Sequence, residues 1–247
     1  MKHEGRSALV TGGAGGIGLA IARALVAEGA DVTIADRDES AAVIAATELQ
    51  CQFWVADLSD PKALDHLDLD FDILVNNAGI QHVQSIIEFD IEVFRRMNRL
   101  MVEAPFRLIQ AALPSMYENG WGRIINVSSV HGLRASPYKS AYVMAKHGLE
   151  GLSKVVALEA GSRGVTSNCV NPGYVRTPLV EAQISAQASA HDLPADRVLE
   201  DVMLTNSAIK RLVEPAEVAD LVSWLASDQA RMITGSSYTI DGGWTAR

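Results

Sequence analysis

The sequence has few cysteines and a shortage of basic residues, and each shortage excludes classes of protein. Cys51 and Cys169 are the only cysteines among the 247 residues. Each lies in an apolar segment, so we expect buried free thiols, with neither a disulfide framework nor a metal site. Lysine and arginine together number 21 against 30 acidic residues, which makes the formal net charge −9. This acidic balance argues against a general affinity for nucleic acid.

No apolar run in the sequence is long enough to cross a bilayer, which needs about 18–20 residues. The longest runs are interrupted early, as Arg23 interrupts residues 20–27. Residues 1–6 are polar and lead directly into a strand pattern, which leaves no place for the apolar core of a signal peptide. We therefore expect a cytoplasmic protein that does not bind membranes.

The sequence does contain the composition of an α/β protein and its alternation of strand and helix patterns. Hydrophobic residues make up 48% and charged residues 21%, which suits one large folded domain over residues 1–247. Short apolar runs alternate with amphipathic stretches, as in a doubly wound parallel sheet with helices on both faces. Seven strands are expected at residues 7–11, 31–36, 52–56, 72–76, 122–128, 166–171 and 237–240. Helices are expected at residues 16–28, 39–49, 91–117, 141–161 and 215–226.

One long segment, residues 177–212, does not follow this alternation of strands and helices. It is rich in alanine and serine, contains Pro178 and Pro194, and lies between the sixth strand and the last helix. Ligands of parallel sheets bind at the carboxyl ends of the strands, where such insertions emerge. The segment therefore predicts a helical lid over a substrate site.

A glycine-rich turn, T-G-G-A-G-G-I-G at residues 11–18, follows the first strand and opens the first helix. Glycines let the backbone turn tightly and approach a pyrophosphate, which the N–H groups and dipole of a helix N-terminus favour. In this context the turn predicts a nucleotide-binding loop of the Rossmann type. Two registers are open, because the spacing fits either Gly13, Gly15 and Gly18 or Gly12, Gly16 and Gly18.

The acidic residue that ends the second strand indicates which dinucleotide is bound. Asp36 follows the glycine turn at close to the expected spacing of about 20 residues. A carboxylate there accepts hydrogen bonds from the adenosine ribose hydroxyls and repels a 2′-phosphate, which favours NAD over NADP. Arg37 is the opposing signal, because a guanidinium binds a 2′-phosphate.

A tyrosine and a lysine four residues apart, Tyr142 and Lys146, point to acid–base chemistry. At this spacing both side chains emerge on one face of a helix. A nearby ammonium stabilises a phenolate and lowers the pKa of the tyrosine, which suits proton transfer near neutral pH. Ser128 and Ser129 end the preceding strand, where a hydroxyl can hydrogen-bond a substrate oxygen.

Taken together, these features resemble the short-chain dehydrogenase/reductase family over nearly the whole chain. The matching strings are the glycine turn, N-N-A-G at residues 76–79, Y-x-x-x-K at residues 142–146 and N-P-G-Y-V-R-T-P at residues 171–178. The resemblance implies that Tyr142 is the acid–base residue and that Ser129 positions the substrate oxygen. It implies that Lys146 lowers the pKa of the tyrosine and binds the nicotinamide ribose, and that Asn98 supports a water relay from that lysine. The implied cofactor contacts are Thr11, Gly12, Gly15, Gly16, Ile17, Gly18, Asp36, Asp57, Leu58, Asn77, Ala78, Gly79, Tyr142, Lys146, Pro172, Gly173, Val175 and Thr177.

Four residues expected at the same sheet edge suggest a small carboxylate as substrate, namely Gln81, His131, Lys139 and Gln183. All four donate hydrogen bonds, and Lys139 and a protonated His131 also carry positive charge. A fixed cation would hold a keto acid so that its carbonyl meets Tyr142. From the residues alone, an exposed lysine and a packed histidine are an equal alternative. Strings from residue 76 to the C-terminus resemble family members that oxidise a small hydroxy acid, in which matching residues bind the carboxylate.

The chain also departs from that pattern. Residues 51–71 form a shorter stretch than usual, Tyr174 stands where tryptophan is common, and residues 186–211 match loosely. These departures affect pocket size and substrate chain length rather than hydride chemistry. A reductase of a sugar acid or 3-oxoacyl substrate, and a dinucleotide-sensing regulatory protein, are the alternatives. The resemblance further implies a homotetramer that forms through the long helices and the last strand.

Overall fold

The sheet of the protein consists of seven parallel strands, which confirms the predicted fold class. The computed structural model describes residues 1–178, 180–181, 184 and 194–246. Within these residues the strand order is β3-β2-β1-β4-β5-β6-β7, and all neighbouring strands are parallel. The strands are β1 (Ser7–Thr11), β2 (Asp31–Asp36), β3 (Gln52–Val55), β4 (Ile73–Asn76), β5 (Gly122–Val127), β6 (Val165–Pro172) and β7 (Ser237–Ile240).

Burial explains why these apolar segments become strands. β5 and β6 are buried at every position, as expected of central strands covered on both faces, whereas the edge strand β3 is mostly exposed. The strand order reverses at β1, because β1 pairs with β2 on one side and with β4 on the other. In such sheets ligands bind in the crevice at the carboxyl ends beside the reversal.

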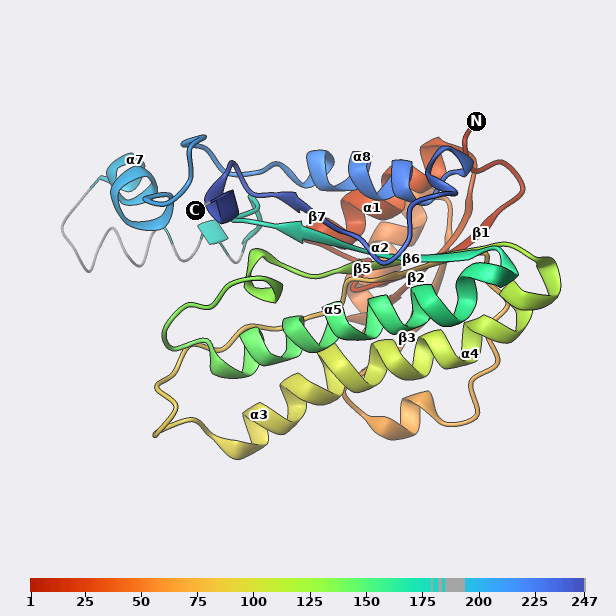
Figure 1. The fold of residues 1–247 in the computed structure, drawn as a ribbon, viewed down its shortest axis with the longest axis horizontal. Helices are drawn as coiled ribbons and strands as arrows, with labels where there is room; N and C mark the ends of the chain where they lie inside the picture. The colour runs from red at the N-terminus through yellow and green to blue at the C-terminus, as the bar shows by residue number, and fades with distance from the viewer. Residues whose placement is uncertain (179, 182–183, 185–193, 247) are drawn as a thin grey trace.

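Two layers of helices cover the sheet (Figure 1). The helices of one face share a hydrophobic core with the strands, and those of the other face form a second core. The first layer contains α1 (Gly16–Ala27), α2 (Glu39–Leu49) and α8 (Pro215–Leu225), and the second contains α4 (Ala104–Asn119) and α5 (Ser140–Ala160).

The predicted helix at residues 91–117 is not continuous. It divides into α3 (Ile91–Asn98), a π-helical turn (Arg99–Glu103) and α4. Pro105 lies at the start of α4 and has no backbone N–H to donate to the carbonyl four residues earlier, which favours an irregular turn at this point. Helical periodicity alone did not reveal the interruption, because apolar residues continue through it.

The described part of the expected lid lies at the same end of the molecule as the C-terminus (Figure 1). It includes α7 (Ala195–Val198) and a π-helical turn (Leu199–Met203). Residues 179, 182–183 and 185–193 of this segment lie outside the described residues. Gln183, one of the predicted substrate contacts, is among them.

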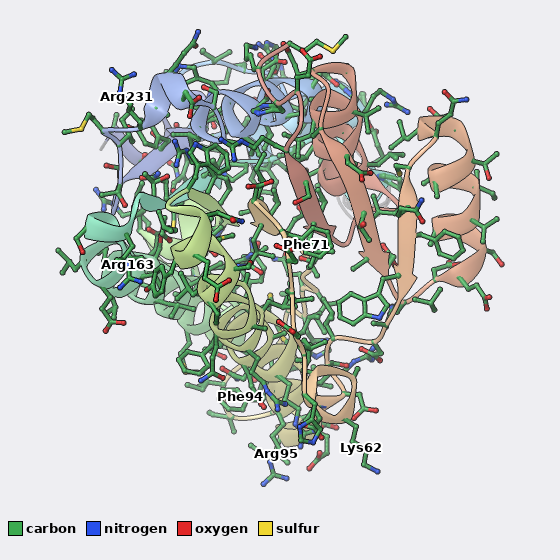
Figure 2. All side chains as sticks on the ribbon, turned by 90° about the vertical axis from the view of Figure 1, so that its right-hand side faces the viewer. Lys62, Phe71, Phe94, Arg95, Arg163 and Arg231 are labelled. Carbon is green, nitrogen blue, oxygen red and sulfur yellow. The ribbon has the colours of Figure 1, made fainter. Side chains whose placement is uncertain are left out.

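The surface of the molecule is charged. Figure 2 shows Lys62, Arg95, Arg163 and Arg231 pointing outward at the periphery.

Among the described residues, no helix combines the length and apolar character required to cross a membrane. The same residues contain no group of three or more histidine, cysteine or acidic side chains suited to hold a metal ion.

Candidate active site

Two adjoining cavities open at the carboxyl ends of the central strands. The larger has a volume of about 400 Å³ and is lined by the glycine turn and by residues that follow β2, β3 and β4. The smaller, of about 280 Å³, is lined by residues that follow β5 and β6 and by Trp244. Tyr142, Ser128 and Gln81 line both cavities. A molecule bound in one cavity therefore lies beside a molecule bound in the other.

Backbone geometry decides the register of the glycine turn. Gly12 and Gly16 have φ angles of +63° and +53°, a left-handed conformation that residues with a side chain rarely adopt. A Cβ on Gly18 would lie 2.0 Å from the carbonyl oxygen of Gly12. Glycine is thus required at Gly12, Gly16 and Gly18, the second of the two registers. Gly13 also excludes a side chain, because its Cβ would lie 2.7 Å from the side chain of Ile34.

Gly15 and the first turn of α1 form a cradle for an anion. Gly15 is the N-cap of α1, with an extended backbone and no side-chain cap, which leaves the first N–H groups of the helix available to a ligand. A Cβ on Gly15 would meet nothing within 4 Å, and the residue lines the larger cavity. The residues present here fit the pyrophosphate of a dinucleotide.

Thr11 supports this turn from behind and does not line either cavity. Its hydroxyl donates to the carbonyl oxygen of Val75 at 3.2 Å and accepts from the backbone N–H groups of Asn77 and Ala78 at 2.9 and 3.0 Å. The side chain is buried. These bonds connect the end of β1 to the end of β4, where the strand order reverses.

An aspartate and two arginines line one part of the larger cavity. The Asp36 carboxylate accepts hydrogen bonds from the backbone N–H groups of Ala14, at 3.2 Å, and Asp38, at 3.1 Å. Arg37 lines the same cavity, and so does Arg96 from α3. Sequence reasoning missed Arg96, because no motif marks it and only the fold brings α3 to this crevice.

Most of the predicted cofactor contacts line one of the two cavities. Hydrogen bonds from Ser59 hold the pKa of Asp57 below its usual value, and Arg96 and Arg37 act in the same direction. The larger cavity is lined by Gly12, Gly15, Ile17, Asp36, Asp57, Leu58, Asn77, Ala78, Gly79, Tyr142, Lys146 and Thr177. The smaller cavity is lined by Pro172, Gly173 and Val175, and also by Ile17 and Thr177.

Ser129, Tyr142 and Lys146 meet where the two cavities join. The side chains of Ser129 and Tyr142 both line the smaller cavity, and the Ser129 hydroxyl acts to lower the pKa of the phenol. The Lys146 Nζ donates to the carbonyl oxygen of Val127 at 2.7 Å and lies 5.6 Å from the centroid of the Tyr142 ring. A phenol, a second hydroxyl and an amine thus surround one point of the crevice, as acid–base chemistry requires.

Gln81, His131 and Lys139 line the smaller cavity with Ser129 and Tyr142. Lys139 is the only lysine or arginine among the described residues of this lining. Burial lowers the pKa of Lys139, because a charged amine loses hydration inside the protein. The cavity therefore combines a single basic side chain with the hydroxyl groups of the reaction centre.

The expectation of a protonated His131 is wrong. Burial lowers the pKa of His131 to about 4, and the positive charges of Lys139 and His147 act in the same direction. The ring contacts two hydroxyls, with Nε2 3.0 Å from Ser136 Oγ and Nδ1 3.5 Å from Ser129 Oγ. His131 is therefore a neutral hydrogen-bonding group at pH 7 and does not add to the positive charge of the site.

Other residues of the smaller cavity were not predicted as substrate contacts. Trp244, from the last turn of the chain (Trp244–Ala246), lies with its ring centroid 5.8 Å from that of His131. The Tyr174 ring centroid is 5.7 Å from the Lys139 Nζ. The sequence marks Tyr174 only as a departure from the family pattern that affects pocket size, and only the folded chain brings Tyr174 and Trp244 to the lining of one cavity. Ser136, Asn206 and Ser207 are polar residues that also line this cavity and were not predicted as substrate contacts.

Comparison with known proteins agrees with this geometry. Residues 12–245 match the family described as enoyl-(acyl carrier protein) reductase. A solved structure titled short chain dehydrogenase/reductase family protein is 36% identical, with a TM-score of 0.89 and complete coverage of both chains. The chain belongs to the short-chain dehydrogenase/reductase family. It is 42% identical to a D-beta-hydroxybutyrate dehydrogenase of Rhizobium meliloti, covering 98% of this chain and 99% of the relative. A D-beta-hydroxybutyrate dehydrogenase of Cupriavidus necator is 41% identical, with 99% of each chain covered.

In this short-chain dehydrogenase/reductase the pKa of Tyr142 departs from the predicted direction. Burial raises the pKa of the phenol, and the Ser129 hydroxyl opposes this only in part. Burial also lowers the pKa of Lys146, to about 8. The sequence predicted a lowered pKa because it shows the amine next to the phenol but not the loss of water around both. The raised pKa leaves the phenol of Tyr142 neutral at pH 7.

Asn98 is the one predicted catalytic residue that lines neither cavity. It ends α3, and its side-chain amide donates to the carbonyl oxygen of Phe94 at 2.8 Å. The π-helical turn begins at the next residue, Arg99. The water relay between Asn98 and Lys146 stays a prediction from the family resemblance.

Proposed function

We propose that this oxidoreductase catalyses the reversible NAD-dependent oxidation of (R)-3-hydroxybutyrate to acetoacetate. The observation that carries the proposal is the lining of the smaller cavity. Ser129 and Tyr142 share it with Lys139, the only basic side chain of its described part apart from the neutral His131. A small acid that pairs with Lys139 would present its other oxygen to the two hydroxyls. The 42% identity to a D-beta-hydroxybutyrate dehydrogenase supports this substrate.

Each residue has a distinct role in the proposed reaction. Tyr142 takes the proton of the substrate hydroxyl during oxidation and returns it to the carbonyl oxygen during reduction. Ser129 hydrogen-bonds the same oxygen, and Lys139 holds the carboxylate. The nicotinamide, when bound, supplies the hydride acceptor or donor. Lys146 lines the larger cavity, and its positive charge near the Tyr142 ring stabilises the phenolate that forms when the phenol gives up its proton.

The decisive experiment measures NADH absorbance after adding each enantiomer of 3-hydroxybutyrate with NAD⁺, and repeats the assay with NADP⁺. We expect NADH from the (R) enantiomer and little from the (S) enantiomer. Equal rates with both enantiomers, or no turnover of either, would contradict the proposal. Catalysis without any carboxylate on the substrate would also count against the role of Lys139.

Asp36 should determine the choice of cofactor. Replacing Asp36 by serine removes the carboxylate that repels a 2′-phosphate and leaves Arg37 and Arg96 in the same cavity. We expect kcat/KM with NADP⁺ to rise about tenfold and kcat/KM with NAD⁺ to fall. Asp38→Ser is the matched control, because Asp38 caps α2 and serine also caps helices well. Unchanged NADP⁺ kinetics in Asp36→Ser would show that Asp36 does not select the cofactor.

A second candidate is another reaction of the same family, such as oxidation of a sugar acid or reduction of a 3-oxoacyl substrate. The polar groups of Ser136, Asn206 and Ser207 in the smaller cavity favour a substrate with more hydroxyls than 3-hydroxybutyrate. Parallel assays with gluconate and with a 3-oxoacyl thioester distinguish these reactions. A higher kcat/KM for either compound would replace the first proposal.

We also propose that the protein acts in the cytoplasm as a homotetramer. α4 exposes Phe106, and α5 exposes Met144 and Leu158, the last with 86% of its surface accessible. Such apolar positions favour helix packing between subunits. Light scattering should give four times the chain mass of 26.5 kDa, and a monomer mass would exclude the assembly. Free cysteines suit a reducing compartment.

A further inference from the structure

A buried carboxylate lies directly behind the catalytic residues. Glu150 is on α5 one turn after Lys146, and only 4% of its surface is exposed. Glutamate is almost never buried to this extent unless its charge is compensated. Its two oxygens accept hydrogen bonds from Asn171 Nδ2 and from Ser237 Oγ, both at 2.5 Å. The proposed reaction has not used this residue.

The carboxylate supports the turn that carries Ser129 and His131. Asn171 Nδ2 donates to the Ser129 carbonyl oxygen at 2.9 Å as well as to Glu150. A Cβ on Gly132 would lie 2.9 Å from Glu150 Oε1, which shows how closely the carboxylate packs against this turn. Glu150 therefore reaches Ser129 through one side chain, that of Asn171.

Glu150 also acts on Lys146 by charge. The titratable groups that face Lys146 in the described structure are Tyr142 and Glu150 from α5 and Cys169 from β6. Burial raises the pKa of the Cys169 thiol, so this group is uncharged near neutral pH. The negative charge of Glu150 opposes the effect of burial on the pKa of Lys146. A protonated Lys146 is the form that stabilises a Tyr142 phenolate.

We propose that Glu150 is a positioning residue, which holds the Ser129 turn through Asn171 and keeps Lys146 protonated at neutral pH. This role rests on the proposed function of Tyr142 and Lys146 in proton transfer. It assigns to one buried side chain both the placement of the substrate-binding hydroxyl and the charge state of the amine.

The test compares Glu150→Gln, Glu150→Asp and the control Glu159→Gln in the full-length protein. Glutamine keeps the shape and loses the charge, whereas aspartate keeps the charge and shortens the reach to Asn171. Glu159 is an exposed glutamate on the same helix. NMR of lysine side chains labelled with carbon-13 follows the titration of Lys146, whose signal is identified by its absence in Lys146→Arg. Steady-state kinetics and thermal unfolding are measured on the same variants.

We expect Glu150→Gln to move the Lys146 titration down by about one pH unit. The pH profile of kcat should move in the same direction. Glu150→Asp should leave the titration within about 0.3 units and lower kcat about tenfold through the loosened Ser129 turn. An unmoved Lys146 titration in Glu150→Gln, or a shifted one in Glu150→Asp, overturns the proposal. If Glu150→Gln does not fold, the titration and kcat of Glu150→Asp decide the question alone.

The NMR titration does not depend on turnover, which separates the two proposals. A wild-type protein that oxidises no 3-hydroxybutyrate, but whose Lys146 titration moves in Glu150→Gln, would refute the proposed substrate and retain the electrostatic role of Glu150. An active wild-type protein with normal kcat and Lys146 titration in both Glu150 variants would refute only the role of Glu150. Glu159→Gln should match the wild type in every measurement, and a shift there would likewise overturn the assignment.

Discussion

Replacing Tyr142 with phenylalanine is expected to lower kcat about 10³-fold and to leave dinucleotide binding within about threefold of the wild type. The substitution removes the single oxygen that can exchange a proton with the substrate and keeps the ring in place. The ring lines both cavities and packs, partly buried, against a hydrophobic cluster, so a change in size would be poorly tolerated, whereas phenylalanine preserves the packing. Steady-state kinetics and quenching of NADH fluorescence measure the two quantities.

Tyr138 provides the control for this experiment. It lies in the loop just before α5, and 62% of its surface is exposed. Tyr138→Phe should therefore have wild-type kcat. A kcat in Tyr142→Phe within about tenfold of the wild type would show that another group moves the proton. Loss of activity together with loss of NADH binding would show that the variant is misfolded, which circular dichroism would detect.

Replacing Lys139 with alanine is expected to raise the KM for acetoacetate about 30-fold with little change in kcat. The charge-assisted hydrogen bond between an ammonium and a carboxylate is worth about 1.5–3 kcal/mol. The bond is the same in the bound substrate and in the transition state, because the carboxylate takes no part in hydride transfer. Lys154→Ala, which changes an exposed lysine of α5, is the matched control. An unchanged KM in Lys139→Ala would remove the carboxylate site from the proposal.

The pH dependence of acetoacetate binding gives a second test of the same residue. Burial lowers the pKa of Lys139, so its positive charge is present at neutral pH and is lost as pH rises through that lowered pKa. The KM for acetoacetate should therefore rise at alkaline pH, earlier than an exposed lysine would predict. Lys139→Arg should flatten this rise, since the guanidinium stays charged.

Much of the fold could be predicted from local patterns. The apolar runs at residues 7–11, 31–36 and 237–240 coincide with β1, β2 and β7. Central strands are buried on both faces, so their apolar character is continuous and visible in the sequence. The predicted helix at residues 91–117 was wrong in its middle, where Pro105 removes a donor and a π-helical turn forms. Such an interruption depends on one missing hydrogen bond, which periodicity does not record.

The candidate site also contains residues that the sequence could identify and residues that only the structure revealed. Tyr142 and Lys146 could be identified because their spacing of four residues is itself a helical geometry. The choice between the two glycine registers required the φ angles of Gly12 and Gly16 and the contact at Gly18. No local pattern points to Arg96 or Trp244 as part of the site, since each comes from an element that only the fold brings to the crevice. Glu150 lies four residues after Lys146 on α5, but this spacing does not show that it is buried and bound to Asn171.

The sequence by itself determined the order of strands and helices, the glycine cradle and the pairing of phenol with amine, because these follow from neighbours along the chain. Only the tertiary structure decided the charge states of the site. Burial leaves His131 neutral, raises the pKa of Tyr142 and lowers that of Lys146 to about 8. The physical reason is that a charge depends on the water removed around it and on the charged groups packed near it, and only the folded chain fixes both.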